Sequence, residues 1–441
     1  MRFLISCKSP EGSSTEVYLY DNLTNEIWHS NGSLMDFRTD DHFVEIPPFT
    51  NLSEAIPMSE TNPLVGKSRR VQVLKIQLGL RCNYHCSYCL QSAWRDLGQT
   101  PKESDVDTFM KKIDDAGIEI KQGGHIELWG GEPLVYIKVL KRLIPLLHKR
   151  FNVLITMVTN GSLLTKELID FFYDNNVKIS ISHDGPGFSL RDDKDPLFIP
   201  HIRDVWLYAF NKSKGTNLAL SFSVVITQKN CNLEDVRDFF NTNFSPEVRV
   251  GFESIVTNIG VGEATSFNDE KKLQLENSIF TLMTQGKESF NLMEYATPLL
   301  KKMVHRFPSS VITGRCSQIR KETLVTDLFG TVGVCQNRPT ETYPIGTIDR
   351  LDKVKNAFMT HWSLRNNCRN CLVLSSCKGS CPVLTDKEHQ AACHNEYIFH
   401  FAIFKVVWAW LTGKIIVDVK VENGKSLVLI TKKTIPIASI G

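Results

Sequence analysis

The 441-residue sequence has no long uninterrupted apolar run and almost no net charge. Its most apolar late stretch, residues 397–413, is interrupted by His400 and Lys405 and is shorter than the roughly 20 apolar residues of a membrane span. We expect a buried amphipathic helix there. The first residues contain too short an apolar stretch for a secretory signal, and a net charge of +3 is no argument for a nucleic-acid partner. We therefore expect a cytoplasmic protein without membrane or nucleic-acid partners.

Twelve cysteines in a chain without an export signal require an explanation other than disulfides. Ten of them fall into two groups. The first group is Cys82, Cys86 and Cys89; the second is Cys316, Cys335, Cys368, Cys371, Cys377, Cys381 and Cys393. Cys7 and Cys231 stand apart, and we expect both to be small buried apolar residues. The two groups are candidate metal or cluster sites.

From residue 71 onward, β-branched apolar runs alternate with helix-like segments. The expected strands cover 71–80, 125–130, 152–160, 177–185, 217–227 and 248–255. Such alternation predicts an α/β fold with a parallel sheet covered by helices. Six units in about 190 residues fit a partial (β/α)6 TIM-type barrel better than the closed eight-unit form. In such sheets, chemistry gathers at the carboxyl ends of the strands.

The sequence predicts four regions, of which the barrel is the second. They are an N-terminal region at 1–70, the barrel at 71–310, a cysteine-rich region with few regular elements at 311–395, and a C-terminal region at 396–441. Segments 16–20 and 25–30 predict a β-hairpin, followed by a polar linker at 46–63. An Asn-Gly turn predicts a second hairpin at 415–431. Either hairpin could pair with an extended peptide, but simple capping of the barrel is favoured for each.

The first cysteine group has the spacing C-x3-C-x2-C. Three thiolates at this spacing can hold one [4Fe–4S] cluster and leave its fourth iron without a protein ligand. The alternative, a structural zinc site, takes four protein ligands and usually has paired C-x2-C spacings. The spacing therefore favours a cluster with one open iron over zinc.

The context of this group resembles the radical S-adenosylmethionine (SAM) superfamily. The trio follows an expected strand and has an aromatic residue, Tyr88, before its last cysteine. Gly130, Gly131, Glu132 and Pro133 then end the second expected strand. In that family the amino and carboxylate groups of SAM chelate the open iron. The resemblance implies that Tyr88 packs beside the adenine, and that Glu132 and the strand-end carbonyls accept from the SAM ammonium.

Two further expected strand ends look like segments of the same family, TNGS after the third strand and SHDGPG after the fourth. The resemblance implies that Ser182 and Asp184 point toward SAM, although both could equally be turn formers. Arg191 and Arg203 are expected to be solvated. The general base stays open, because Asp184, Glu253 and several histidines are all eligible.

The second cysteine group has the spacing C-x13-G-x4-C, then C-x2-C-x5-C-x3-C, then x11-C. Zinc takes ligands in fours, and seven cysteines leave one zinc site short. The full spacing resembles the SPASM extension of peptide-modifying radical SAM enzymes, which holds two auxiliary [4Fe–4S] clusters. The resemblance implies that Cys316, Cys335 and Cys381 hold auxiliary cluster I, and that Cys368, Cys371, Cys377 and Cys393 hold auxiliary cluster II. The fourth ligand of cluster I stays open.

The resemblance implies SAM and three [4Fe–4S] clusters as cofactors, and a flavodoxin or ferredoxin-type electron donor. Reductive cleavage of SAM gives methionine and a 5′-deoxyadenosyl radical, which removes a hydrogen from an unactivated carbon. The auxiliary clusters would take up the electron that leaves the oxidised substrate.

Three functions remain in view: a maturase that cross-links a ribosomally made precursor peptide, an anaerobic sulfatase-maturating enzyme, and a non-catalytic iron–sulfur or zinc scaffold. Sulfatase-maturating enzymes carry an Asp base immediately after the second SPASM cysteine. Here Cys335 is followed by Gln336, which cannot take a proton. The sequence looks closest to the cyclophane-forming and darobactin-synthase-like maturases. We therefore expect a peptide-acting oxidoreductase that forms a carbon–carbon or ether cross-link.

Overall fold

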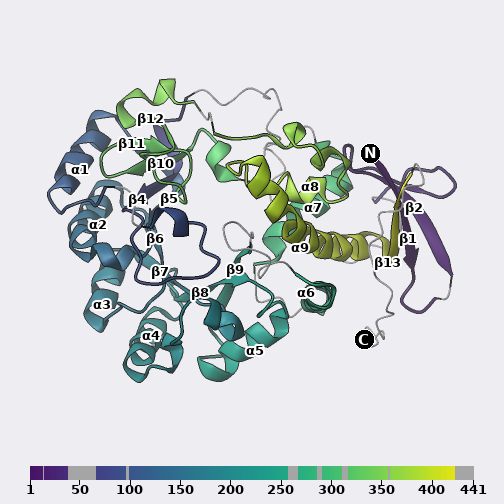
Figure 1. Cartoon of the computed structure of the whole chain (residues 1–441), viewed down its shortest axis with the longest axis horizontal. Helices are drawn as coiled ribbons and strands as arrows, with labels where there is room; N and C mark the ends of the chain where they lie inside the picture. The colour runs from purple at the N-terminus through teal and green to yellow at the C-terminus, as the bar shows by residue number, and fades with distance from the viewer. Residues whose placement is uncertain are drawn as a thin grey trace.

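The computed structural model describes residues 1–12, 14–37, 66–95, 99–256, 267–285, 291–309, 316–355 and 358–422. The expected linker at 46–63 lies outside these residues. The described strands form a nine-stranded sheet and a four-stranded sheet (Figure 1). The larger sheet contains the expected barrel strands, and the smaller sheet joins the two ends of the described chain.

Six strands of the larger sheet form the predicted parallel series. They are β4 (Arg70–Gln77), β5 (Glu119–Trp129), β6 (Leu154–Thr159), β7 (Val177–Ser182), β8 (Ser221–Ile226) and β9 (Arg249–Ile255). Each pairs in parallel with the next. Alternate side chains such as Ile155 and Met157 are buried under the helices, as the two-residue repeat of a strand requires. Because β9 ends the sheet, the barrel is partial, which confirms the predicted α/β fold.

Five amphipathic helices connect these strands. They are α1 (Asp105–Asp115), α2 (Ile137–Phe151), α3 (Lys166–Asp174), α4 (Pro200–Ser213) and α5 (Leu233–Asn243). In α2, the buried residues Leu140, Leu143, Ile144 and Leu147 recur at helical spacing and form one apolar stripe. Figure 1 shows the five helices along the outer side of the sheet. The inner side and the strand ends are thereby left for the functional site.

A strand from the cysteine-rich region extends the barrel sheet beyond β4. β10 (Thr323–Asp327) pairs in parallel with β4, and β11 (Thr331–Gly333) and β12 (Pro344–Thr347) follow antiparallel. All five side chains of β10 are buried. The sequence predicted few regular elements here, because a five-residue run becomes a strand only when a neighbouring edge supplies its hydrogen bonds. The cysteine-rich region is therefore attached to the strand that precedes the first cysteine group.

The smaller sheet has the order β13-β1-β2-β3. Its strands are β1 (Arg2–Lys8), β2 (Thr15–Asp21), β3 (Ile27–His29) and β13 (Ile415–Val421). The antiparallel pairing of β2 with β3 confirms the N-terminal hairpin. β13 pairs with β1, a strand that the sequence analysis did not predict. The expected second strand of the hairpin at 415–431 extends outside the described residues. The first and last expected regions thus share one sheet.

The remaining helices, three long and one short, lie between the two sheets. They are α6 (Asp269–Thr284), α7 (Met293–His305), the short α8 (Leu374–Cys377) and α9 (Asp386–Thr412). α9 runs from the cysteine-rich region to the smaller sheet (Figure 1). There the buried Trp408 packs edge-on against Tyr18, with ring centroids 5.7 Å apart. The predicted helix at 397–413 is the buried second half of α9. Within the described residues, no helix is both long and apolar enough to cross a membrane.

Candidate functional site

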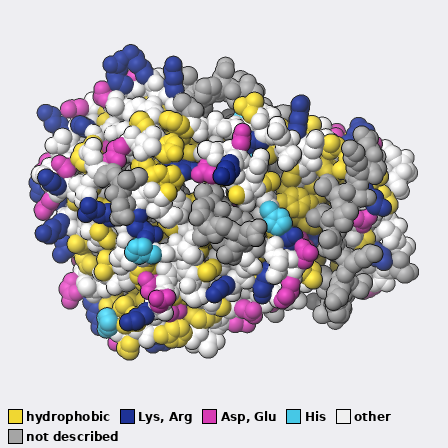
Figure 2. Space-filling model, viewed as in Figure 1, with side chains coloured by type: hydrophobic (Ala, Val, Ile, Leu, Met, Phe, Trp, Pro, Cys, Tyr) yellow, Lys and Arg dark blue, Asp and Glu magenta, His cyan; other side chains and the backbone are white. Residues whose placement is uncertain are grey.

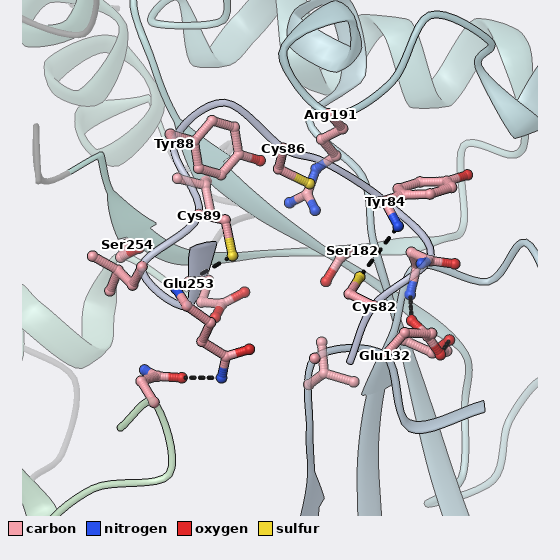
Figure 3. Close-up of a pocket in the computed structure, with 18 of the residues that line it drawn as sticks. Cys82, Tyr84, Cys86, Tyr88, Cys89, Glu132, Ser182, Arg191, Glu253 and Ser254 are labelled. Carbon is pink, nitrogen blue, oxygen red and sulfur yellow. Dashed lines mark hydrogen bonds between the residues drawn. The ribbon is translucent and has the colours of Figure 1, made fainter. Parts of the chain in front are cut away.

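A cavity opens where the barrel strands end (Figure 3). The segment after β4 places the first cysteine group on its wall, and the end of β5 adds Gly130, Gly131 and Glu132. Later strands add Ser182 from β7 and Glu253 from β9. The carboxyl ends of parallel strands meet at one edge of a sheet. The motifs that the sequence analysis placed at the carboxyl ends of the strands therefore line one cavity.

The three thiols of the first group suit an iron–sulfur cluster. The N–H of Tyr84 donates to Cys82 Sγ at 3.3 Å, and the N–H of Gln91 donates to Cys89 Sγ at 3.4 Å. Burial raises the pKa of the Cys82 and Cys86 thiols to about 11. Thiolate is the metal-binding form, so iron would supply the positive charge that these thiols need. Along the described cavity wall there is no fourth cysteine and no histidine, which fits one open iron better than closed zinc.

The glycines of the GGEP motif pack directly against the cysteine loop. The N–H of Gly131 donates to Gly79 O at 3.0 Å, and the N–H of Glu132 donates to Arg81 O at 2.9 Å. A side-chain carbon at Gly131 would lie 2.3 Å from Leu80 O. Only glycine permits this approach of two backbones. The motif thereby holds the cysteine loop against the end of β5.

Glu132 lines the cavity, but other groups already bind its carboxylate. Oε1 accepts from Leu134 N at 3.0 Å and from Thr159 Oγ1 at 2.6 Å. Oε2 accepts from Asn160 N at 2.7 Å. Burial raises the pKa of this carboxyl, and the three hydrogen bonds oppose the rise. Glu132 thus ties β5 to β6, while Pro133 begins the 3-10 turn at Pro133–Tyr136.

Tyr88, Asp184 and Arg191 form a buried group beside the cavity. The Tyr88 hydroxyl donates to Asp184, and Arg191 donates to both carboxylate oxygens at 2.8 and 2.9 Å. Tyr88 and Arg191 line the cavity; Asp184 is fully buried behind them. The prediction of a solvated Arg191 is wrong, because the Asp184 carboxylate compensates its charge away from water. Arg203 is half-buried on α4 and donates to a backbone carbonyl at 3.2 Å.

One functional contact was not expected from the sequence. Gln91 Nε2 donates to Asn337 Oδ1 at 3.2 Å, although the two residues are 246 positions apart. Asn337 lines the cavity, and its N–H donates to Cys335 Sγ at 3.4 Å. The second cysteine group therefore borders the same cavity as the first. No local pattern reveals a contact between segments so distant in the chain.

Cys316, Cys335 and Cys381 lie near one another in the second cysteine region. Burial, together with the neighbouring Cys381 and Cys316 thiols, raises the pKa of Cys335 to about 12. Burial and then Cys316 likewise raise the pKa of Cys381, to about 11. Gln336 Oε1 accepts from Gln318 Nε2 at 2.9 Å, so this amide is already hydrogen-bonded. The three thiols suit one cluster with a fourth position open.

A second set of thiols lies closer to α9. It consists of Cys368, Cys371 and Cys393. Burial raises the pKa of Cys371 to about 12, with further contributions from Cys393 and Cys368. Cys377 Sγ lies within 4.8 Å of ligand atoms of Glu396 and His400, both buried on α9. The assignment of Cys377 to auxiliary cluster II therefore stays a prediction.

Buried basic side chains near these thiols have donors that the sulfur atoms of a cluster could accept from. Arg365 Nε and Nη1 and Lys378 Nζ are buried without a hydrogen-bond partner among the described residues. Arg365 interacts electrostatically with Cys368, Cys381 and Cys377. Buried donors normally have partners, and the sulfur atoms of a cluster would provide them. The unsatisfied donors therefore fit iron–sulfur clusters in this region.

Residues 76–239 match the Radical SAM superfamily. The chain is 21% identical over 349 residues to the radical SAM cyclopropyl synthase TigE of Paramaledivibacter caminithermalis, across 74% of this chain and 71% of TigE. It is 26% identical over 207 residues to a GTP 3′,8-cyclase of Clostridium perfringens, across 45% of this chain and 59% of the cyclase. The structure of anSMEcpe with bound AdoMet is similar with a TM-score of 0.56 and 17% identity, across 78% of this chain and 98% of anSMEcpe.

The superfamily match covers the first cysteine group, the GGEP motif and the buried Tyr88–Asp184–Arg191 group. The solved structure shows the same fold at low identity. Within that fold, the three thiols of the first group line the cavity at the strand ends. Together, these findings indicate a radical SAM domain at residues 76–239, with a cavity whose thiols are suited to a [4Fe–4S] cluster and SAM.

Proposed function

We propose that this enzyme removes a hydrogen from a side-chain carbon of a small ribosomally made precursor peptide and forms an intramolecular cross-link. The observation that carries this proposal is the Gln91–Asn337 contact, which brings the second cysteine region to the cavity wall. An oxidative cross-link releases an electron after the hydrogen has been removed. Clusters in a region that borders the cavity provide an acceptor for that electron.

The named reaction of one similar protein and the peptide bound to another support the choice of a peptide cross-linking reaction. TigE is named a cyclopropyl synthase, so its reaction closes a ring of carbon atoms. anSMEcpe has been solved with AdoMet and a peptide, Cp18Cys, in the same structure. A peptide substrate and a new bond between carbon atoms are therefore both represented among proteins similar to this chain.

In this proposal the SAM-cleaving [4Fe–4S] cluster is held by Cys82, Cys86 and Cys89. When bound, it supplies the electron that splits SAM into methionine and the hydrogen-abstracting 5′-deoxyadenosyl radical. The GGEP backbone receives the SAM ammonium. Tyr88, which Asp184 and Arg191 hold in place, packs beside the adenine. Enclosure by these groups keeps water away from the reactive species.

The auxiliary clusters are assigned to the second cysteine group. Cluster I is held by Cys316, Cys335 and Cys381, and cluster II by Cys368, Cys371, Cys377 and Cys393. Lys67 lies near Cys316, one of the thiols assigned to cluster I. Burial lowers the pKa of this lysine to about 8, and Cys316 opposes that change. A flavodoxin or ferredoxin-type protein is the proposed electron donor. The auxiliary clusters would then pass the substrate electron to an external electron-carrier protein or back to the SAM-cleaving cluster.

Formylglycine formation by a sulfatase-maturating enzyme is the weaker alternative. Its base would stand at Gln336, whose side-chain oxygen accepts from Gln318 Nε2 and whose carbonyl accepts from Gln77 Nε2. An amide in this position cannot take a proton. The non-catalytic scaffold is weaker still, because a scaffold has no need for a cavity beside an open cluster.

The test is anaerobic reconstitution with iron and sulfide, followed by SAM, a reductant and, in separate reactions, a synthetic candidate precursor peptide with aromatic residues or a sulfatase-derived peptide. We expect iron–sulfur absorbance, 5′-deoxyadenosine, and a peptide lighter by two hydrogens. A protein that binds only zinc and shows no iron–sulfur absorbance would support the scaffold instead. A formylglycine-containing sulfatase peptide as the product would support the weaker alternative.

A further inference from the structure

The pairing of β8 with β9 contains a shift of register. Val224 lies opposite Phe252, and Val225 lies opposite Ser254, so Glu253 is an extra residue on β9. A β-bulge of this kind turns side chains out of the regular alternation, and bulges are frequent beside active sites. The bulge places Glu253 on the cavity wall.

Contacts on both sides of the strand hold the bulge. Phe252 stacks on Phe399 of α9 with ring centroids 4.7 Å apart, and its N–H donates to Asn291 Oδ1 at 2.6 Å. On β8, the N–H of Val225 donates to Asp184 Oδ1 at 3.0 Å. Because three other elements hold these strands, the position of Glu253 is determined by tertiary structure.

The Glu253 side chain faces the cavity together with Ser182 and the first cysteine group (Figure 3). Its Oε2 accepts from Ser223 Oγ at 3.0 Å. The side chain is exposed to the open cavity. The protein around the cavity partly desolvates the carboxyl and raises its pKa, while Arg191 and Ser223 oppose the rise. A carboxylate with a raised pKa is a stronger proton acceptor than one in water.

The other eligible bases are already engaged. Asp184 is ion-paired with Arg191 behind the wall. His183 is fully buried and hydrogen-bonded to Asp195 at 2.8 Å. Both Glu132 oxygens accept from other protein groups. Along the cavity wall, Glu253 is the carboxylate with an oxygen, Oε1, to which no group among the described residues donates.

We propose that Glu253 takes up the proton released as the cross-link forms, an inference that rests on the proposed cross-linking of a peptide. The 5′-deoxyadenosyl radical takes one hydrogen atom from a side-chain carbon, giving 5′-deoxyadenosine. The carbon radical then bonds to an aromatic ring of the same peptide. The ring loses one proton to Glu253 and one electron to an oxidised iron–sulfur cluster. Aromaticity is restored, and the peptide has lost two hydrogens.

The test compares the reconstituted wild-type enzyme with Glu253→Gln and with Glu247→Gln as a matched control. Glu247 precedes β9 at the opposite end of the strand, where it pairs with Lys214 on the surface. The probe is the same candidate precursor peptide, synthesised with deuterated side chains. We expect Glu253→Gln to move deuterium into 5′-deoxyadenosine as the wild type does, but to form cross-linked peptide about 100-fold more slowly.

Each other outcome has a definite meaning. Cross-linking by Glu253→Gln at the wild-type rate would overturn the proposal. Loss of SAM cleavage in this variant without peptide would also overturn it, because Glu253 would then serve SAM. A wild-type enzyme that cleaves SAM but leaves the peptide unchanged would refute the proposed function itself. Iron–sulfur absorbance establishes folding, and Glu253→Asp, which keeps a carboxylate, should recover part of the cross-linking rate.

Discussion

The two cysteine regions of this enzyme differ in how they are enclosed. Cys82, Cys86 and Cys89 lie partly exposed on the wall of a cavity at the strand ends. In the second region, Cys335 and Cys368 are buried and the other five cysteines are partly exposed. Among the described residues, the buried Arg365 Nε and Nη1 and Lys378 Nζ have no hydrogen-bond partner there. An open site can receive SAM and a substrate. An enclosed site beside it is suited to passing electrons.

The largest expected effect separates the two regions directly. Cys82→Ala should abolish 5′-deoxyadenosine formation, because SAM then lacks the iron that binds it. Cys335→Ala should leave SAM cleavage measurable but stop formation of the peptide product. Chromatography of an anaerobic reaction measures both products, and Cys231→Ala controls for the loss of a buried cysteine. If Cys335→Ala loses SAM cleavage as completely as Cys82→Ala, the two regions do not act separately.

The next effect concerns charge beside the open site. Asp184→Asn removes the partner of the buried Arg191, and we expect the free energy of unfolding to fall by about 3–5 kcal/mol. Asp107→Asn breaks a solvent-exposed pair with Arg142, joined at 2.6 Å, and should change little because water screens it. Chemical denaturation followed by circular dichroism measures both. Similar losses in the two variants would contradict the assigned role of burial.

A third effect comes from an ion pair between β4 and β5, the two strands that lead into the first cysteine group and the GGEP motif. Lys75 Nζ lies 2.8 Å from Glu127 Oε2. Burial alone would raise the pKa of Glu127, but His125, Lys75 and Trp129 lower it to about 2. A depressed pKa stabilises the fold above the unfolded value of about 4.3, and this stability is lost as pH falls toward 2.

We therefore expect acid unfolding to remove about 2–3 kcal/mol of stability through Glu127 between about pH 5 and pH 2. Glu127→Gln should lose that part of the pH dependence and be less stable at neutral pH. Denaturation curves at several pH values provide the measurement. An unchanged pH dependence in the variant would show that this carboxylate carries no such stabilisation.

The smallest effect concerns the start of α9, which carries Cys393. The Thr385 hydroxyl accepts from the N–H of Glu388, and the Glu388 carboxylate accepts from the N–H of Thr385. Thr385→Ala should cost about 1 kcal/mol, while Thr385→Ser keeps the cap and should cost much less. Thermal unfolding measures the difference. A shift in the auxiliary-cluster spectrum without a loss of stability would point to a different role for this cap.

The barrel and both cysteine groups were predictable because their signals are local. Strand and helix periods repeat every few residues, and thiol spacing within a loop limits which metal site it can form. β10 was missed because five residues carry too little pattern until β4 supplies an edge. Arg191 was misjudged because its burial depends on Asp184 at the end of another element.

Glu253 was eligible in the sequence but could not be selected there, since a bulge is a property of two paired strands. The Gln91–Asn337 contact was equally invisible, because it joins segments far apart in the chain. The sequence by itself thus determined the α/β barrel and the spacing of a cysteine trio suited to one cluster, because both are short-range patterns, and its motifs predicted SAM chemistry by their resemblance to a known family. Only the tertiary structure decided which carboxylate faces the cavity and that the second cysteine region borders it, because long-range packing sets both.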